Sequence, residues 1–96
     1  NTTFQLGDYQ FSCLFTPGHS PGSITLLETT EKITIVGDVL FNGSIGRTDL
    51  PGGHHQTLLN SIQTELFALD PETIVYSGHG PSTSIGHEKT TNPFFN

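Results

Sequence analysis

Two histidines and one aspartate, His19, Asp38 and His79, are the residues of this sequence best suited to chemistry. Each follows a predicted strand and stands in a glycine-containing loop, and ligands collect at such loops in open sheets. Two imidazoles and a carboxylate suit a divalent ion such as zinc, which leaves a coordination position for water. A single loop histidine is more often only solvated or hydrogen-bonded. The three residues together predict a metal site for hydrolysis.

The elements that carry the first two of these loops are predicted from hydrophobic alternation and turn residues. Two strands form a hairpin around Gly7-Asp8, and the second buries one face, because Tyr9, Phe11, Cys13 and Phe15 alternate against Gln10 and Ser12. A loop with two prolines and two glycines follows and contains His19. Two further strands then lead to Asp38. The predicted strands are Thr3–Leu6, Tyr9–Phe15, Ser23–Glu28 and Ile33–Val36.

The second half of the chain is predicted to contain one long loop, two helices and one strand. Glycines make Val39–Gly53 an irregular loop. Leucine and isoleucine at helical spacing predict a helix over His54–Leu69, closed by Asp70-Pro71. Thr73–Ser77 is a strand too apolar to lie exposed, and it leads to His79. A short helix over Ser84–Thr91 completes the chain.

Length and composition exclude several classes of protein. The 96 residues allow at most one domain. The formal net charge of −6 disfavours binding to nucleic acid or to an anionic membrane, and no apolar run is long enough to span a bilayer. One cysteine cannot form an internal disulfide. We therefore expect a soluble, cytoplasmic protein. The lack of methionine and the start at Asn1 suggest a piece of a longer chain.

Several motifs resemble the metallo-β-lactamase superfamily, and most of all its glyoxalase II-like hydrolases. They occur in the family's order over nearly the whole chain: Thr16-Pro17-Gly18-His19-Ser20-Pro21-Gly22-Ser23, Val36-Gly37-Asp38-Val39-Leu40-Phe41, Gly43-Ser44-Ile45-Gly46-Arg47-Thr48-Asp49, Leu69-Asp70-Pro71, Ser77-Gly78-His79-Gly80-Pro81 and Asn92-Pro93-Phe94. The fold that this resemblance implies is α+β: half of an αββα four-layer sandwich, with a mixed or antiparallel sheet and helices on one face.

The resemblance also implies a two-metal site. The position of His19 completes the first metal, Asp38 bridges both metals, and His79 completes the second. The family's remaining ligands lie in a His-x-His-x-Asp-His motif, which does not occur between Asn1 and Asn96. Residues 1–96 are therefore expected to be the carboxyl-terminal half of one domain, with the missing amino-terminal half as partner. The half alone would hold one metal or none.

The activity implied for the intact parent is metal-dependent hydrolysis of a thioester, such as a glutathione conjugate of a small hydroxy acid. Two ions about 3.5–4 Å apart would supply a bridging hydroxide as nucleophile, with Asp38 positioning both. Zinc is the expected metal, with iron or manganese as alternatives. A persulfide dioxygenase-like iron enzyme, a lactonase or a β-lactamase would share the fold. The fragment itself could instead be an inert half-domain, and its exposed apolar face should cause self-association.

Four other residues have side chains that could serve the site or the fold. Arg47, the only arginine, would either bind a substrate carboxylate or form an ion pair with Asp49 that shapes the loop. Cys13 is more consistent with a core position than with a nucleophile. His54 stands where relatives often have an aspartate at a helix start, which suggests a weaker cap and not a new ligand. His87 is expected to face solvent.

Overall fold

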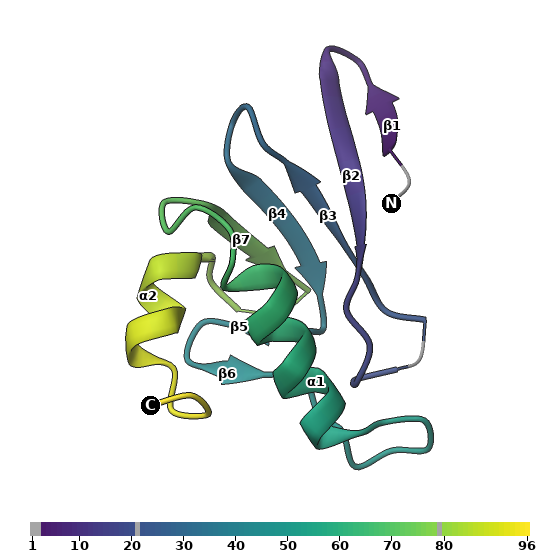
Figure 1. Cartoon of the computed structure of the whole chain (residues 1–96), viewed down its shortest axis with the longest axis vertical. Helices are drawn as coiled ribbons and strands as arrows, with labels where there is room; N and C mark the ends of the chain where they lie inside the picture. The colour runs from purple at the N-terminus through teal and green to yellow at the C-terminus, as the bar shows by residue number, and fades with distance from the viewer. Residues whose placement is uncertain (1–2, 21, 79) are drawn as a thin grey trace.

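The computed structural model describes residues 3–20, 22–78 and 80–96, and it has one mixed sheet with helices against one face (Figure 1). The six-stranded sheet has the order β1-β2-β3-β4-β7-β8. Its neighbours are antiparallel except β4 and β7, which run parallel. The strands are β1 (Thr3–Leu6), β2 (Tyr9–Phe15), β3 (Ile24–Glu28), β4 (Ile33–Gly37), β7 (Ile74–Ser77) and β8 (Thr83–Ser84). The α+β class, the mixed sheet and the one-sided helices are confirmed.

The long segment after β4 is not the irregular loop that the glycines predicted. Leu40–Phe41 (β5) and Ser44–Ile45 (β6) pair as a small antiparallel hairpin. Gly43 makes the turn possible with φ near +78°, which glycine adopts without the steric cost of a side chain. An Asn-Gly pair between apolar residues is a known hairpin signal, and Asn42-Gly43 carries it. The prediction overlooked this local signal in favour of glycine content.

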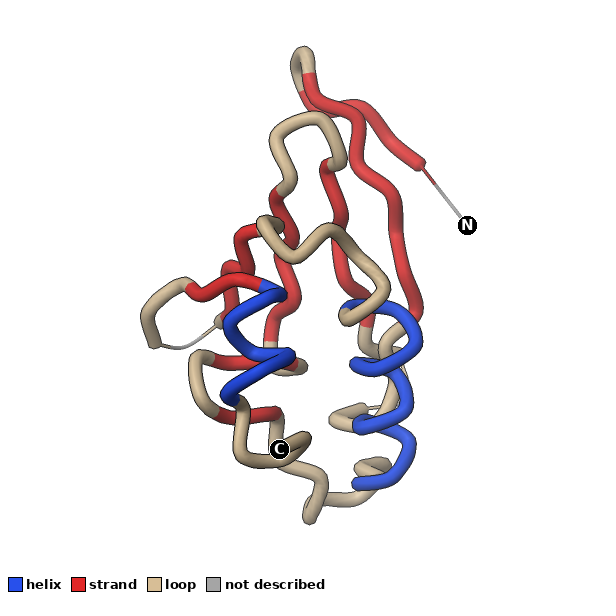
Figure 2. Tube along the Cα trace, turned by 60° about the vertical axis from the view of Figure 1, so that its left-hand side comes forward, coloured by secondary structure: helices blue, strands red, loops and turns tan. Residues whose placement is uncertain are grey.

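The predicted helix over 54–69 is shorter than expected and changes its winding. It consists of α1 (His55–Ser61) and a π-helical turn, η1 (Ile62–Leu66), which Figure 2 shows as one continuous run. The Phe67 N–H donates to the Ile62 carbonyl at 2.8 Å, an i→i+5 bond that ends the regular helix. The second helix, α2 (Ile85–Thr91), lies close to its predicted bounds. No helix in these ranges is long and apolar enough to cross a bilayer.

The hydrophobic core lies between the helices and one face of the sheet. Val36 of β4 and Val75 of β7 point toward the helices, because Val75 pairs with Thr34 and β4 alternates every two residues. The helices contribute residues at i, i+4 and i+8 spacing. The core consists of Val36, Val39, Leu40, Ile45, Leu58, Ile62, Leu66, Phe67, Val75 and Ile85.

The opposite face of the sheet, here called the open face, is apolar but uncovered. Register places Phe15 opposite Ile24 and Leu26 opposite Ile35, and Ile35 pairs with Tyr76. Phe15 is 65% exposed and Tyr76 is 48% exposed. The predicted burial is therefore wrong for both ends of the β2 face and for Ile74 and Tyr76 of β7, whereas Val75 of β7 is buried on the other face. Cys13 of β2 is half-buried. The physical reason is that no described element packs over this side.

A buried carboxylate joins α2 to the β5–β6 hairpin. Glu88 is fully buried and accepts hydrogen bonds from the Gly43 N–H at 2.9 Å and the Thr83 hydroxyl at 2.6 Å. The Asn92 amide donates to the same carboxylate at 2.9 Å and to the Ser44 carbonyl at 3.1 Å. A buried polar group is tolerated when such partners satisfy it. The network therefore fixes the hairpin that leads into Gly46 and Arg47.

Candidate metal centre

The structure brings together two of the three predicted metal ligands. His19 lies in the loop between β2 and β3, and Asp38 lies directly after β4. The His19 Nε2 atom is 3.7 Å from the Asp38 Oδ2 atom, and both side chains are partly accessible, at 26% and 43%. Residues far apart in the sequence thus meet because β3 and β4 are adjacent antiparallel strands. Both loops open at the same end of the sheet.

The hydrogen bond of the His19 ring selects which nitrogen can bind a metal. Nδ1 lies 2.8 Å from the carbonyl oxygen of Arg47. A carbonyl oxygen only accepts, so in this hydrogen bond Nδ1 carries the proton. Neutral His19 then has its lone pair on Nε2, the nitrogen that faces Asp38. Metal-binding histidines in proteins are commonly held this way, with the other ring nitrogen donating to a carbonyl.

The separation of the two donor atoms fits one shared ion. At 3.7 Å, Nε2 and Oδ2 are beyond direct hydrogen-bonding distance. His19 Nε2 and Asp38 Oδ2 would together hold such an ion, which would lower the pKa of a bound water. One imidazole nitrogen and one carboxylate oxygen are ligands that zinc and iron both accept. The donor set therefore fits a divalent metal.

The loop that carries His19 is held from both sides by hydrogen bonds to its backbone. Its base is closed by the Thr16 N–H, which donates to the Ser23 carbonyl at 3.0 Å. Against α1, the Ser61 hydroxyl donates to the Pro17 carbonyl at 2.8 Å, and the His54 N–H donates to the Gly18 carbonyl at 2.6 Å. Gly18 also packs directly on the backbone of Leu58, where a Cβ would collide. Its role in this structure is contact with α1.

Two further glycines, Gly46 and Gly78, pack closely against Asp38. A Cβ on Gly46 would overlap the Asp38 carbonyl oxygen, and one on Gly78 would lie 2.9 Å from Asp38 Oδ1. The Gly78 N–H also donates to the Gly37 carbonyl at 2.8 Å, which ties the end of β7 to the end of β4. The predicted motifs that follow Asp38 and surround His79 contain these two glycines. The structure shows that at Gly46 and Gly78 glycine lets one loop approach another.

The third predicted ligand, His79, lies outside the described residues. Within residues 3–20, 22–78 and 80–96, no group of three His, Cys, Asp or Glu side chains is arranged to hold a metal ion. The described part of the candidate site therefore contains two of the three predicted ligands, His19 and Asp38.

The other candidate residues have well-defined surroundings. Arg47 forms a two-pronged ion pair with Asp49, at 2.8 and 2.9 Å, so the predicted loop-shaping pair is present. The hydrogen bond from Arg47 lowers the pKa of the Asp49 carboxyl, and Asp49 in turn raises the pKa of Arg47. His54 caps α1, because its Nδ1 accepts from the Thr57 N–H at 3.2 Å. His87 is solvent-exposed on α2, as expected.

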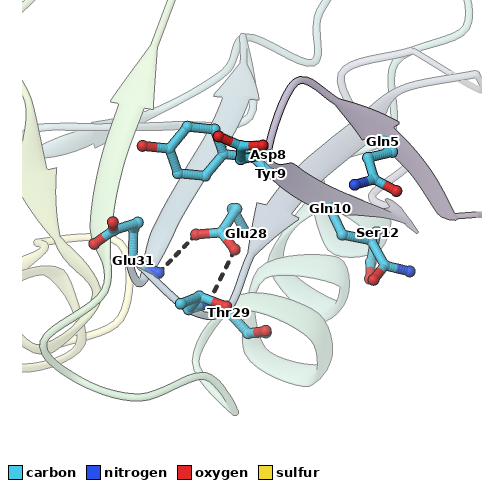
Figure 3. A pocket seen from close by; sticks show the side chains of 9 residues that line it. Gln5, Asp8, Tyr9, Gln10, Ser12, Glu28, Thr29 and Glu31 are labelled. Atoms are coloured by element: carbon cyan, nitrogen blue, oxygen red, sulfur yellow. Dashed lines mark hydrogen bonds between the residues drawn. The ribbon is translucent and has the colours of Figure 1, made fainter.

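One surface depression lies away from these residues. It has a volume of about 650 Å³ and lies between the β1–β2 hairpin and the turn after β3. Figure 3 shows its polar lining, including Gln10, Glu28 and Glu31. The Glu28 carboxylate already accepts from the Thr30 and Glu31 N–H groups at 3.1 and 2.6 Å. The Glu28 side chain is thus bound within the turn, and neither His19 nor Asp38 lines this depression.

Comparison with known proteins assigns the family. Residues 12–79 match the model of the metallo-beta-lactamase superfamily, so the chain belongs to this superfamily. It is 48% identical over 92 residues to the hydroxyacylglutathione hydrolase GloC of Haemophilus influenzae. Among solved structures, it is similar to the BLEG-1 B3 metallo-beta-lactamase, with a TM-score of 0.94 and 49% identity. It is also similar to TTHA1623 in a di-iron-bound form, with a TM-score of 0.86 and 44% identity.

These matches cover nearly all of this chain but less than half of each relative. The alignment with the hydrolase GloC takes in 96% of this chain and 43% of that protein. The corresponding shares are 99% and 46% for the B3 enzyme, and 95% and 44% for the di-iron protein. The chain therefore spans less than half the length of the relatives it matches.

Proposed function

We propose that this chain is the carboxyl-terminal half of a metal-dependent hydrolase that cleaves thioesters, with His19, Asp38 and His79 as its share of the metal ligands. The observation that carries the proposal is the pairing of His19 Nε2 with Asp38 Oδ2 at 3.7 Å, with Nδ1 held by the Arg47 carbonyl. The similarity to a hydroxyacylglutathione hydrolase supports a glutathione thioester as substrate.

In the proposed reaction, His19 and Asp38 bind metal, and nearby glycines hold the loops in place. His19 offers one unprotonated ring nitrogen, and Asp38 offers a carboxylate oxygen on the same side. Asp38 has two oxygens and could therefore contact two ions and orient the attacking water. Divalent ions, when bound, lower the pKa of a water molecule and stabilise negative charge developing on a carbonyl. The protein is left with the task of holding rigid geometry, which the loop contacts of Gly18, Gly46 and Gly78 serve.

The open face supports the proposal that a second half-domain belongs to this one. Phe15, Ile24, Ile35, Ile74 and Tyr76 lie on this face and are each at least 36% exposed. An apolar sheet face of this kind normally packs against another sheet about 10 Å away. The amino-terminal half would cover this face and supply the remaining ligands. The 96 residues alone should then show no useful turnover.

The proposal is tested on the full-length protein. Metal content and hydrolysis of a glutathione thioester of a small hydroxy acid should be measured for the wild type, Asp38→Asn and His19→Gln. Both variants should lose more than 100-fold in kcat/KM, because changes to groups around metal ligands alone cost about 10–100-fold. His87→Gln, which changes an exposed histidine on α2, is the matched control and should keep its activity. Wild-type activity in either ligand variant would refute the roles of these residues.

Iron chemistry is the second candidate, because a similar structure is described as di-iron-bound. An imidazole and a carboxylate suit iron as well as zinc. Metal analysis separates the two, since bound iron together with oxygen consumption would replace the thioester proposal. Cleavage of a β-lactam or a lactone, with no thioester cleavage, would instead assign the substrate class suggested by the similarity to the B3 enzyme.

A further inference from the structure

The loop between β6 and α1 contains the Arg47–Asp49 ion pair, and the backbone carbonyl of Arg47 contacts the His19 ring. Arg47 and Asp49 form two parallel hydrogen bonds, Nε to Oδ1 at 2.8 Å and Nη2 to Oδ2 at 2.9 Å. Two-pronged pairs of this kind fix orientation more strongly than single contacts do. The side chains themselves are 60% and 70% exposed and lie outside the core. Their effect is therefore on the course of the loop, and not on the stability of the fold.

The loop is anchored at both ends and contains a turn, in which the Gly53 N–H donates to the Leu50 carbonyl at 2.9 Å; the ion pair lies between the first anchor and this turn. On one side the Gly46 N–H donates to the Val39 carbonyl at 3.0 Å, and on the other the His54 N–H donates to the Gly18 carbonyl at 2.6 Å. Between these anchors, the Arg47 carbonyl must point at His19 Nδ1 to accept its proton at 2.8 Å. A peptide carbonyl in a loop can rotate when its neighbours are unrestrained. The bond from side chain 47 to side chain 49 restrains the backbone on the carboxyl side of this carbonyl.

We propose that the Arg47–Asp49 ion pair is a positioning element for the metal ligand His19: it holds the Arg47 carbonyl against Nδ1 and thereby keeps the lone pair of Nε2 on the metal side. The inference rests on the proposed metal site and deepens it. It assigns Arg47 a task through its backbone, whereas a substrate-binding arginine would act through its guanidinium. The two tasks predict different measurements.

The first test reads the His19 tautomer directly and needs no metal. Long-range ¹H–¹⁵N correlation at pH 8, where histidine is neutral, should show the wild-type ring with its proton on Nδ1. Asp49→Ala should shift the population toward the Nε2–H form. Asp70→Ala removes another exposed ion pair, Lys32 Nζ to Asp70 Oδ2 at 3.0 Å, and is the matched control with no effect on His19. A wild-type proton on Nε2, or an unchanged tautomer in Asp49→Ala, overturns the inference.

The second test measures metal affinity and kinetics of the full-length protein. Asp49→Ala and Arg47→Lys should each weaken zinc binding about fivefold, the effect of one exposed but well-aligned ion pair. Lysine keeps the charge but cannot form the two-pronged contact. The KM of the metal-saturated variants should stay within about twofold of the wild type. A raised KM with unchanged zinc affinity in Arg47→Lys would assign its guanidinium to the substrate and overturn the inference.

The failure of this inference is distinguishable from the failure of the proposed function. A wild-type protein that binds no metal refutes the proposed function, while the tautomer measurement still decides the role of the ion pair in placing His19. A wild-type protein that binds metal with unchanged affinity in Asp49→Ala keeps the proposed function and removes the positioning role.

Discussion

The two faces of the sheet both carry apolar side chains, but only one face is buried. On the covered face, Val36 and Val75 are almost fully buried against the helices. At the neighbouring positions of the same strands, Ile35 and Tyr76 are 43% and 48% exposed on the open face. Alternation along a strand separates two sets of side chains, but it does not say which set will be covered. Only the elements packed on each face decide that.

The polar groups show the same contrast. On the covered side, Thr16 and Thr25 share a hydrogen bond at 3.1 Å, and the Thr34 hydroxyl donates to the Ile74 carbonyl at 3.2 Å. No buried side-chain nitrogen or oxygen in the described ranges lacks a partner. The covered side is therefore a completed interior, whereas the open face has the composition of an interior without its cover. The predictions below test this difference.

The largest effect is expected from matched substitutions on the two faces. Ile62→Ala should lower the free energy of unfolding by about 2–5 kcal/mol, because Ile62 is completely buried in the core. Ile35→Ala makes the same chemical change on the open face and should cost about 1 kcal/mol or less, mainly through strand preference. Urea unfolding of both variants measures the difference. Equal losses would show that the open face is covered in solution.

Glu88→Ala tests the polar network on the covered side. The substitution leaves the Gly43 N–H, the Thr83 hydroxyl and the Asn92 amide without their buried acceptor. We expect a loss of about 2–4 kcal/mol, since each buried unsatisfied group costs on the order of 1–3 kcal/mol and water partly compensates. Glu72→Ala, at an exposed glutamate, is the control. A loss no larger than that of the control would mean that the network does not stabilise the hairpin.

Self-association tests whether the open face binds apolar surface. The isolated chain should associate at high concentration, and the double variant Phe15→Ser, Ile35→Thr should weaken association by tenfold or more, because two apolar side chains would no longer be buried. Light scattering over a concentration series measures this, with His87→Ser as a control on the helical side. A wild-type chain that stays monomeric at the highest concentration would contradict the expectation.

The smallest effect on stability is expected at the exposed ion pair between Lys32 and Asp70. The Glu72 N–H and then the Lys32 ammonium lower the pKa of the Asp70 carboxyl. A depressed folded-state pKa stabilises the fold above the unfolded value near 3.8, and this stabilisation is lost as pH falls through the lower folded value. Asp70→Asn should therefore slightly reduce the dependence of stability on pH below about pH 4. An identical acid profile for the two proteins would show that this contact contributes nothing.

Local patterns were sufficient for most of the fold and part of the site. The bounds of β1 and β2 match their predictions, because alternation and the Gly7 turn are local signals. The change from α1 to η1 was not predictable in this way, since the choice between i→i+4 and i→i+5 bonding depends on packing. The β5–β6 hairpin had a local signal in Asn42-Gly43 that glycine content obscured.

The sequence by itself determined which residues could bind a metal and the family to which they belong, because residue type and order are local properties of the chain. Only the tertiary structure decided that His19 Nε2 lies 3.7 Å from Asp38 Oδ2 and that the Arg47 carbonyl holds the other ring nitrogen. It also decided which sheet face is buried. These outcomes depend on contacts between segments far apart in the chain, and no local pattern encodes the distance between two loops.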